Sequence, residues 1–112
     1  MGLVKSIVSR GDIWLINLDP TMGSEIKKTR PCVVVSPQEM HDFLRTVIIA
    51  PMTTKGRQAS FRLPITHDGK KGLILLDQIR TIDKTRLVKR LGAVSNKSLG
   101  ASLDILQATF TL

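Results

Sequence analysis

The chain has 112 residues, and its 17 Lys and Arg against 9 Asp and Glu leave a net charge of +8 at pH 7. A hydrophobic fraction of 42% at this length is typical of one globular domain and argues against disorder. The single cysteine, Cys32, excludes a disulfide framework and a cysteine-based zinc site, and it fits a reducing cytoplasm. No apolar run is long enough for a membrane helix. The positive charge points to phosphate, a membrane surface or an acidic protein as the partner.

Apolar stretches between turn signals predict a series of short strands. They are expected over residues 12–18, 32–36, 46–52, 60–65, 73–82 and 87–91. Between them, residues 19–30 form a long polar loop, 37–44 a short helical or irregular piece, and 67–72 a hairpin turn. Pro31 opens its strand, where a missing N–H costs least, and Pro51 indicates an edge or a bulge near the end of 46–52.

A helix is predicted at the C-terminus, with Ser95 as its N-cap. Four apolar residues follow at helical spacing on one face: Leu99, Leu103, Leu106 and Phe110. Gly100 weakens the helix interior by about 1 kcal/mol relative to Ala, so the helix must gain stability by packing on the sheet. Short strands with one terminal helix predict a mainly β (α+β) fold, a small and strongly bent β-barrel capped by a helix, with residues 1–112 as a single domain.

The sequence offers little support for metal or cysteine chemistry. His41 and His67 lie far apart in no metal-ligand motif, and each is expected to be a surface or loop residue. Cys32 opens an apolar strand and is expected to be a buried, inert thiol. No glycine-rich phosphate loop is present, so we expect no cofactor and look for chemistry in carboxylates, arginines and hydroxyls.

Arg30 and Glu25 are the first candidates for such chemistry. Arg30 precedes Pro31 where the long loop enters a strand, a position that can aim its guanidinium into a cleft. There it could stabilise the charge of a phosphorane, or it could be a solvated charge at a strand start. Glu25 lies beside Lys27 and Lys28, which favour its charged form, but it could equally form a salt bridge within the loop.

Thr53, Thr54, Lys55 and Arg57 form a second cluster, directly after a buried strand. Hydroxyls, backbone N–H groups and cations at such a position can hold phosphate. Further cations up to Arg80 and beyond could belong to the same basic surface. Tyr is absent and the other aromatic residues are few, which argues against a platform for base stacking. An RNA ligand would therefore be held mainly through its phosphates and base edges.

Four blocks of the sequence carry a family resemblance. They read RGDIWLINLDPTMGSE at residues 10–25, TRPCVVVSP at 29–37, APMTT at 50–54 and LLDQIRTID at 75–83. In order and spacing they resemble the MazF/PemK/Kid toxins over nearly the whole chain. The resemblance implies an SH3-like barrel, a homodimer, and metal-independent cleavage of single-stranded RNA by 2′-OH attack. It also implies a cognate antitoxin whose acidic tail lies along the RNA groove.

The same resemblance assigns roles to individual residues. The catalytic arginine and threonine of the family fall on Arg30 and Thr53, and its glutamate falls on Glu25, which would accept the 2′-OH proton or fix Arg30. The acidic residue and glutamine that read RNA fall on Asp77 and Gln78. Some members carry a His where this chain has Ser24 and an Arg where it has Leu75, so this chain resembles the branch that relies on Arg and Thr.

The leading hypothesis is a cytoplasmic, sequence-specific endoribonuclease toxin. Its catalytic residues would be Arg30, Thr53 and Glu25. Its RNA-binding residues would be Ser24, Lys27, Lys28, Thr54, Lys55, Arg57, Asp77, Gln78 and Arg80. Two alternatives stay open: a toxin of the same fold that poisons gyrase without cutting, and a basic RNA-binding module that leaves the strand intact.

Overall fold

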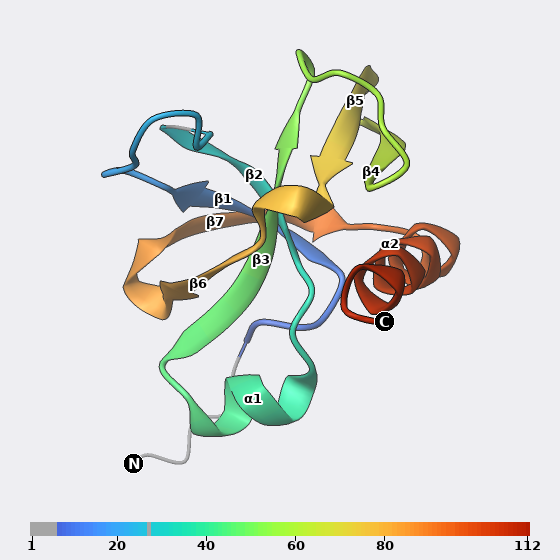
Figure 1. Ribbon diagram of the computed structural model, residues 1–112. Helices are drawn as coiled ribbons and strands as arrows, with labels where there is room; N and C mark the ends of the chain where they lie inside the picture. The colour runs from blue at the N-terminus through green and yellow to red at the C-terminus, as the bar shows by residue number, and fades with distance from the viewer. Residues whose placement is uncertain (1–6, 27) are drawn as a thin grey trace.

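The computed structural model describes residues 7–26 and 28–112, whose strands form one strongly curled antiparallel sheet (Figure 1). Its strands lie in the order β4-β5-β3-β2-β1-β7, and β6 pairs with β3 beside this path. The strands are β1 (Asp12–Asn17), β2 (Thr29–Val34), β3 (Thr46–Thr53), β4 (Arg62–His67), β5 (Lys70–Leu75), β6 (Arg80–Asp83) and β7 (Leu87–Ala93). The helical elements are α1 (Gln38–Phe43), α2 (Asn96–Thr109) and two single 3-10 turns, η1 (Leu76–Gln78) and η2 (Lys84–Arg86).

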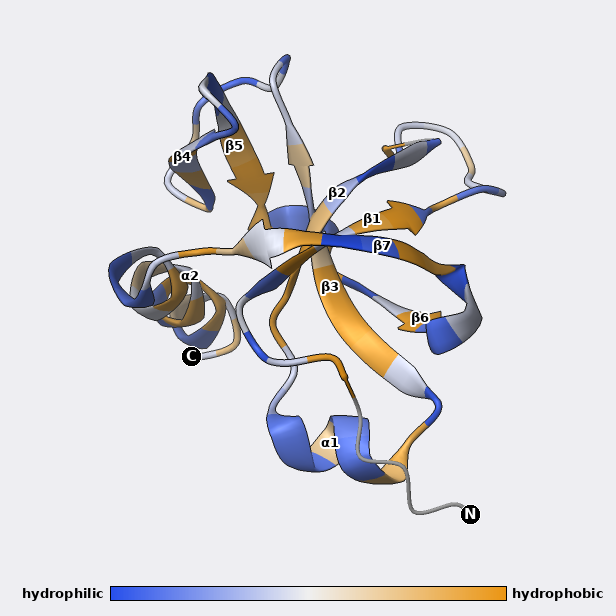
Figure 2. Cartoon of the chain, turned by 180° about the vertical axis from the view of Figure 1, so that it is seen from behind, coloured by the Kyte–Doolittle hydropathy of each residue, from blue (hydrophilic) through white to orange (hydrophobic). Residues whose placement is uncertain are grey.

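Alternating residues of β1, β2 and β3 build two hydrophobic clusters. One contains Trp14, Ile16, Cys32, Val34 and Ile49, and the other contains Ile13, Val33, Ala50, Met52 and Ile74. Because successive side chains of a strand point to opposite faces, strands that are buried on both faces appear as the continuous apolar runs of this sequence. In Figure 2 the hydrophobic colour is accordingly strong along β1, β3 and β5.

The predicted C-terminal helix is confirmed as α2. The Ser95 hydroxyl oxygen accepts a hydrogen bond from the Ser98 N–H at 3.1 Å and caps the first turn. Ile105 and Leu106 pack on the second hydrophobic cluster, whereas Phe110 at the end of the predicted stripe is 75% exposed. The mainly β fold with a terminal helix is therefore confirmed, with a sheet curled into a half-barrel.

Pro51 lies where the ladder of β3 has no bond to lose. Because the Val35 N–H donates to the Ile48 carbonyl, the backbone N–H and C=O groups of Ile48 face β2. Three residues later, the backbone of Pro51 faces the opposite side of β3. On that side β3 pairs with β6 up to Ile49 and with β5 only from Met52. Of the two positions expected for Pro51, an edge or a bulge, the edge is therefore wrong, because β3 is paired on both sides and changes partner at the proline.

Three further expectations need correction. Pro31 is the third residue of β2, not its first, and the span expected as one strand over 73–82 is divided into β5, η1 and β6. His41 is not a surface residue: it is buried in α1, with its ring nitrogens at 2.6 Å from Ser36 Oγ and 3.1 Å from the Val8 carbonyl oxygen. Hydrogen bonds on both sides of the ring allow this polar side chain to be buried.

The expected hairpin turn over 67–72 is shorter in the structure. His67 pairs with Lys70, and only Asp68 and Gly69 form the turn, at φ values of 52° and 74°. Two central residues with positive φ match the right-handed twist of the flanking strands, and an Asp-Gly pair tolerates them best. His67 therefore belongs to the end of β4, and its side chain is placed by the sheet.

Candidate active site

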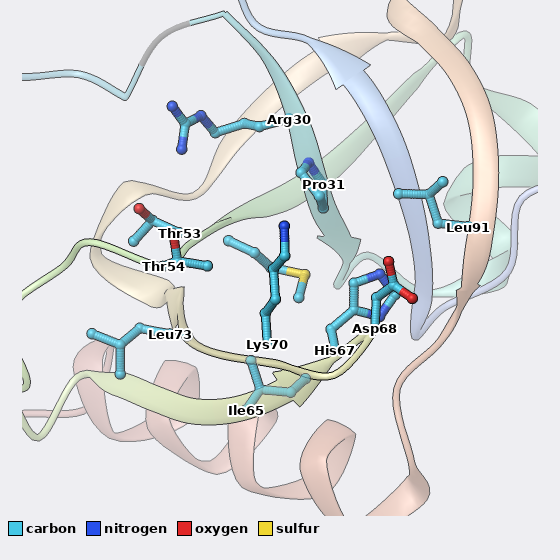
Figure 3. Close-up of a pocket in the computed structure, with 12 residues that line it drawn as sticks. Arg30, Pro31, Thr53, Thr54, Ile65, His67, Asp68, Lys70, Leu73 and Leu91 are labelled. Atoms are coloured by element: carbon cyan, nitrogen blue, oxygen red, sulfur yellow. The ribbon is translucent and has the colours of Figure 1, made fainter.

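Arg30 and Thr53 line the same cleft, which has a volume of about 640 Å³. The β2–β3 register pairs Cys32 with Pro51, and continuing it by two residues on each strand brings Arg30 opposite Thr53. Figure 3 shows both side chains at one end of the cleft, with His67, Asp68 and Leu91 at the other end. A cation that keeps its charge and a hydroxyl at adjacent strand ends can together contact one phosphate.

Thr53 is held in place by close backbone packing. A Cβ atom on Gly72 would lie 2.5 Å from the Thr53 carbonyl oxygen, so only glycine fits at this point of β5. The Thr53 hydroxyl oxygen accepts a hydrogen bond from the Lys55 N–H at 3.2 Å, which leaves the hydroxyl proton for donation to a ligand. Thr54 lines the same cleft.

Cys32 is fully buried in β2, two residues after Arg30. Burial raises the pKa of its thiol to about 12, although the charges of Arg30 and Arg80 act in the opposite direction. The thiol is therefore protonated at neutral pH, and the prediction of a buried, inert cysteine is confirmed.

Glu25 lies in a second cleft of about 410 Å³, which Ser24, Gln78 and Arg80 also line. One of its carboxylate oxygens accepts a hydrogen bond from the Met22 N–H at 2.6 Å, within its own loop. Pro51 lines this second cleft and its neighbour Met52 lines the first, so the two clefts adjoin. The structure thus brings Arg30 and Thr53 together in one cleft and places Glu25 in the second.

The turn η1 contacts the first residue of β4 and the loop that carries Glu25. Asp77 accepts two hydrogen bonds from Arg62, from Nε to Oδ1 and from Nη2 to Oδ2, each at 3.0 Å. This contact lowers the pKa of the Asp77 carboxyl and raises the pKa of the Arg62 guanidinium. Gln78 accepts a hydrogen bond through Oε1 from the Ile26 N–H at 2.9 Å.

The predicted cations are distributed around the clefts. Lys28, Lys55 and Arg57 are exposed, and Lys27 lies outside the described residues. Arg80 is half-buried at the start of β6 and donates to the Leu18 carbonyl oxygen at 3.0 Å, so it also supports the base of the 18–28 loop.

His67, Lys70 and Leu91 line the cleft of Arg30 and Thr53, and the sequence alone did not single them out. A signal for His67 exists, because Leu63, Ile65 and His67 alternate along one face of β4. Lys70 and Leu91 reach the cleft only through strand pairing, from β5 and β7.

Metal-ligand clusters and membrane-spanning helices are both missing from the part of the chain that the structure describes. Residues 7–26 and 28–112 contain no group of three or more His, Cys, Asp and Glu that could hold a metal ion. No helix in this part of the chain is long and apolar enough to cross a membrane.

Comparison with known proteins adds sequence evidence. Residues 9–110 match the family model of the PemK-like, MazF-like toxin of type II toxin–antitoxin systems. The chain is 37% identical to "Endoribonuclease PemK" of Escherichia coli, covering 96% of this chain and 85% of that protein. It is 32% identical to "Endoribonuclease EndoA" of Bacillus subtilis (strain 168), covering 95% of this chain and 97% of that protein.

Solved structures show the same fold. MazF (Form-I) from Deinococcus radiodurans superposes with a TM-score of 0.83 at 21% identity, covering 94% of this chain and 97% of that one. An endoribonuclease in complex with its cognate antitoxin, from Mycobacterial species, superposes with a TM-score of 0.78 at 18% identity, covering 94% and 98%. The curled sheet and the terminal helix are common to these chains.

Proposed function

Because this chain belongs to the PemK-like, MazF-like toxins and is an endoribonuclease toxin of that type, we propose that it cleaves single-stranded RNA at specific sequences without a metal ion. In the proposed reaction the ribose 2′ oxygen attacks the adjacent phosphorus and the bond from phosphorus to O5′ breaks. The 2′-OH proton passes to a base, and O5′ takes up a proton. The products are a 2′,3′-cyclic phosphate and a 5′-OH end.

The placement of Arg30 and Thr53 in one cleft is the observation that carries this proposal. The Arg30 guanidinium would donate to the non-bridging phosphate oxygens as charge develops on them in the transition state. The Thr53 hydroxyl would donate to the same phosphate and fix its orientation. Both groups act as hydrogen-bond donors, so they stabilise charge rather than move protons.

Glu25 is proposed as the acceptor of the 2′-OH proton, from the adjoining cleft, or as the group that fixes Arg30. These two roles differ in their kinetics. Glu25→Gln keeps an acceptor for the Met22 N–H but removes the base. A general base leaves its ionisation in the pH–rate profile, so loss of the acid limb of that profile in Glu25→Gln would identify the base, whereas a lower kcat with an unchanged profile would identify the positioning role.

The remaining polar residues around the clefts are proposed to bind RNA. They are Ser24, Lys27, Lys28, Thr54, Lys55, Arg57, Asp77, Gln78 and Arg80. The net charge of +8 supports this role, because phosphate contacts supply most of the affinity for nucleic acid. The same surface would bind the acidic tail of a cognate antitoxin, which would compete with RNA. We also propose that the toxin acts as a homodimer in the cytoplasm.

The test incubates the purified protein with a long single-stranded RNA in EDTA, with Arg30→Ala as the variant. We expect discrete fragments with 5′-OH ends from the wild type and a loss of kcat/KM of about 100-fold or more in the variant, as for removal of other oxyanion donors. Lys97→Ala is the matched control, because it removes one positive charge from an exposed position on α2.

Three outcomes would contradict the proposal. A fully active Arg30→Ala variant would exclude the arginine mechanism, and activity lost in EDTA but restored by a metal would exclude metal independence. RNA left intact by the wild type would favour a gyrase poison or a non-cleaving RNA-binding module.

A further inference from the structure

We infer that Arg62 is a positioning residue that selects the RNA sequence to be cut, because it ties the loop over 54–61 to η1, which also holds the loop over 18–28. The inference rests on the proposed ribonuclease function and deepens it. Arg62 itself is not among the residues that the family resemblance assigns to catalysis or RNA binding.

The contact between Arg62 and Asp77 is the first support. The planar guanidinium meets the carboxylate with two parallel hydrogen bonds of 3.0 Å, a geometry that Lys cannot reproduce. The Arg62 and Asp77 side chains are 19% and 29% exposed, so the surrounding protein shields them from most of the solvent. Such a pair resists screening by salt better than an exposed one and holds a defined geometry.

The remaining donor of Arg62 holds the loop over 54–61. Nη1 donates to the Arg57 carbonyl oxygen at 3.2 Å, near the middle of this loop. The guanidinium also lies 5.8 Å from the ring centroid of Phe61, at the end of the loop. Arg62 therefore fixes the backbone that carries Lys55 and Arg57, with Asp77 of η1 as its anchor.

Gln78, the next residue of η1, holds the other loop. Its Oε1 accepts the Ile26 N–H at 2.9 Å, one residue after Glu25. Adjacent residues of a single 3-10 turn thus hold the loop over 18–28 directly, through Gln78, and the loop over 54–61 through Asp77 and Arg62. Because base identity is read by groups on such loops, their relative placement decides which nucleotides fit.

The backbone positions of Arg30 and Thr53 do not depend on this contact. They are placed by the β2–β3 register and by the close approach of Gly72 to Thr53. Loss of Arg62 should therefore relax the choice of sequence and weaken binding of the preferred RNA, while the phosphate chemistry at a bound site continues. A change in KM and in the sequences cut, with little change in kcat, would therefore identify this role of Arg62.

The experiment sequences the 5′-OH ends that wild type and Arg62→Ala produce from one long RNA, and it measures kcat and KM on an oligonucleotide with the preferred wild-type site. We expect the variant to cut additional sequences, with KM raised about tenfold, as for loss of a charged hydrogen bond, and kcat changed less than about twofold. Lys97→Ala, again with one charge fewer, should cut the wild-type sequences with wild-type KM.

Two more variants test the mechanism. Arg62→Lys keeps the charge without the two-pronged contact, so it should retain the broadened sequence choice while KM recovers in part. In Arg62→Ala/Asp77→Ala the effects should not add, and the pattern of cut sequences should equal that of Asp77→Ala alone. If Arg62→Ala fails to fold by thermal melting, Arg62→Lys carries the test.

Two outcomes would overturn the inference while the wild type cuts RNA. One is an unchanged set of cut sequences with unchanged KM in folded Arg62→Ala and Arg62→Lys. The other is an unchanged set of sequences with a salt slope of log KM that is smaller by about 0.7, which would identify a direct phosphate contact. A wild type that cuts no RNA would instead refute the proposed function on which the inference rests.

Discussion

Cys32 is buried in β2, two residues after Arg30. Burial raises the pKa of its thiol more than the nearby charges of Arg30 and Arg80 lower it. His41 shows the same dominance of burial, because burial lowers its pKa although the Val8 carbonyl favours a protonated ring nitrogen. Nδ1 can only donate to that carbonyl, so in the neutral ring Nε2 accepts from the Ser36 hydroxyl. At the scale of single residues, desolvation thus removes both groups from chemistry near neutral pH.

A first prediction concerns thiol reactivity. Because the pKa of Cys32 is raised to about 12, the folded protein should not react with iodoacetamide at pH 7–8, whereas the urea-unfolded chain should react fully. Mass spectrometry of the labelled protein measures both states. Modification of the native protein at the rate of the unfolded chain would contradict the burial of this thiol.

A second prediction concerns the pH dependence of stability. The pKa of His41 is lowered in the folded state, so the unfolded chain binds more protons as pH falls. The free energy of unfolding should be nearly constant between about pH 6.5 and about pH 8, below the ordinary thiol pKa, and should decrease below about pH 6.5, toward the folded pKa of His41. In His41→Gln, the slope of the free energy of unfolding against pH in this range should be smaller, by up to about the slope that one proton contributes.

Urea unfolding at several pH values measures this slope. His67→Gln is the matched control, because it removes the half-buried cleft histidine and leaves His41 in place. Equal slopes in wild type and His41→Gln would show that the buried imidazole does not contribute.

At the scale of elements, the contact of β3 with β5 positions Thr53. β5 presents Gly72 where the Thr53 carbonyl comes closest, and Met52 and Thr53 pair with Ile74 and Leu73. The strand therefore needs its glycine for close approach, in addition to the apolar residues that fill the second cluster.

Gly72→Ala should disturb both stability and activity. The new Cβ would lie 2.5 Å from a backbone oxygen, so β3 or β5 must shift, at a cost of about 1–3 kcal/mol. Thr53 would move with the strand, and kcat should fall in protein that is still folded. Urea unfolding and RNA cleavage measure the two effects, and wild-type values in both would refute the role of this close contact.

Gly100→Ala should have the opposite effect on stability. The added Cβ meets nothing within 4 Å, and α2 gains the helix propensity of Ala, so the protein should be more stable by up to about 1 kcal/mol. Cleavage should be unchanged, because Gly100 lies on an exposed face away from both clefts. Thermal melting checks the direction, and a lower melting temperature would contradict it.

At the scale of the whole molecule, the cations behind the net charge of +8 include some that form hydrogen bonds within the protein and others that are exposed. Arg62 and Arg80 use their donors on Asp77, Arg57 and Leu18, whereas Lys55 and Arg57 have exposed side chains on the loop over 54–61. The exposed group is expected to act through phosphate contacts, which add affinity without choosing a base.

The salt dependence of cleavage should follow this division. We expect log kcat/KM to fall linearly with log salt, with a slope of about −0.7 for each phosphate contacted, while kcat at saturating RNA stays nearly constant. Lys55→Ala should make the slope shallower by about 0.7 and leave the cut sequences unchanged. A slope near zero for the wild type would contradict electrostatic binding of RNA.

Much of the architecture could be predicted from local patterns. The Ser95 cap and the apolar stripe predicted α2, and alternation with turn residues predicted most strands, because these signals lie within a few residues of one another. The break of 73–82 into β5, η1 and β6 was not predicted, since its residues can continue a strand and only the curvature of the sheet interrupts it. His41 was misjudged because its partners, Val8 and Ser36, come from other segments.

The same distinction separates the candidate residues from the site they form. The sequence by itself determined the family and named Arg30, Thr53 and Glu25 as candidates, since motifs are local and their order along the chain is directly visible. Only the tertiary structure decided that Arg30 and Thr53 share a cleft, that Glu25 lies in the adjoining one, and that Arg62 holds Asp77. Strand register and loop anchoring bring together residues distant in sequence, and no local pattern encodes those distances.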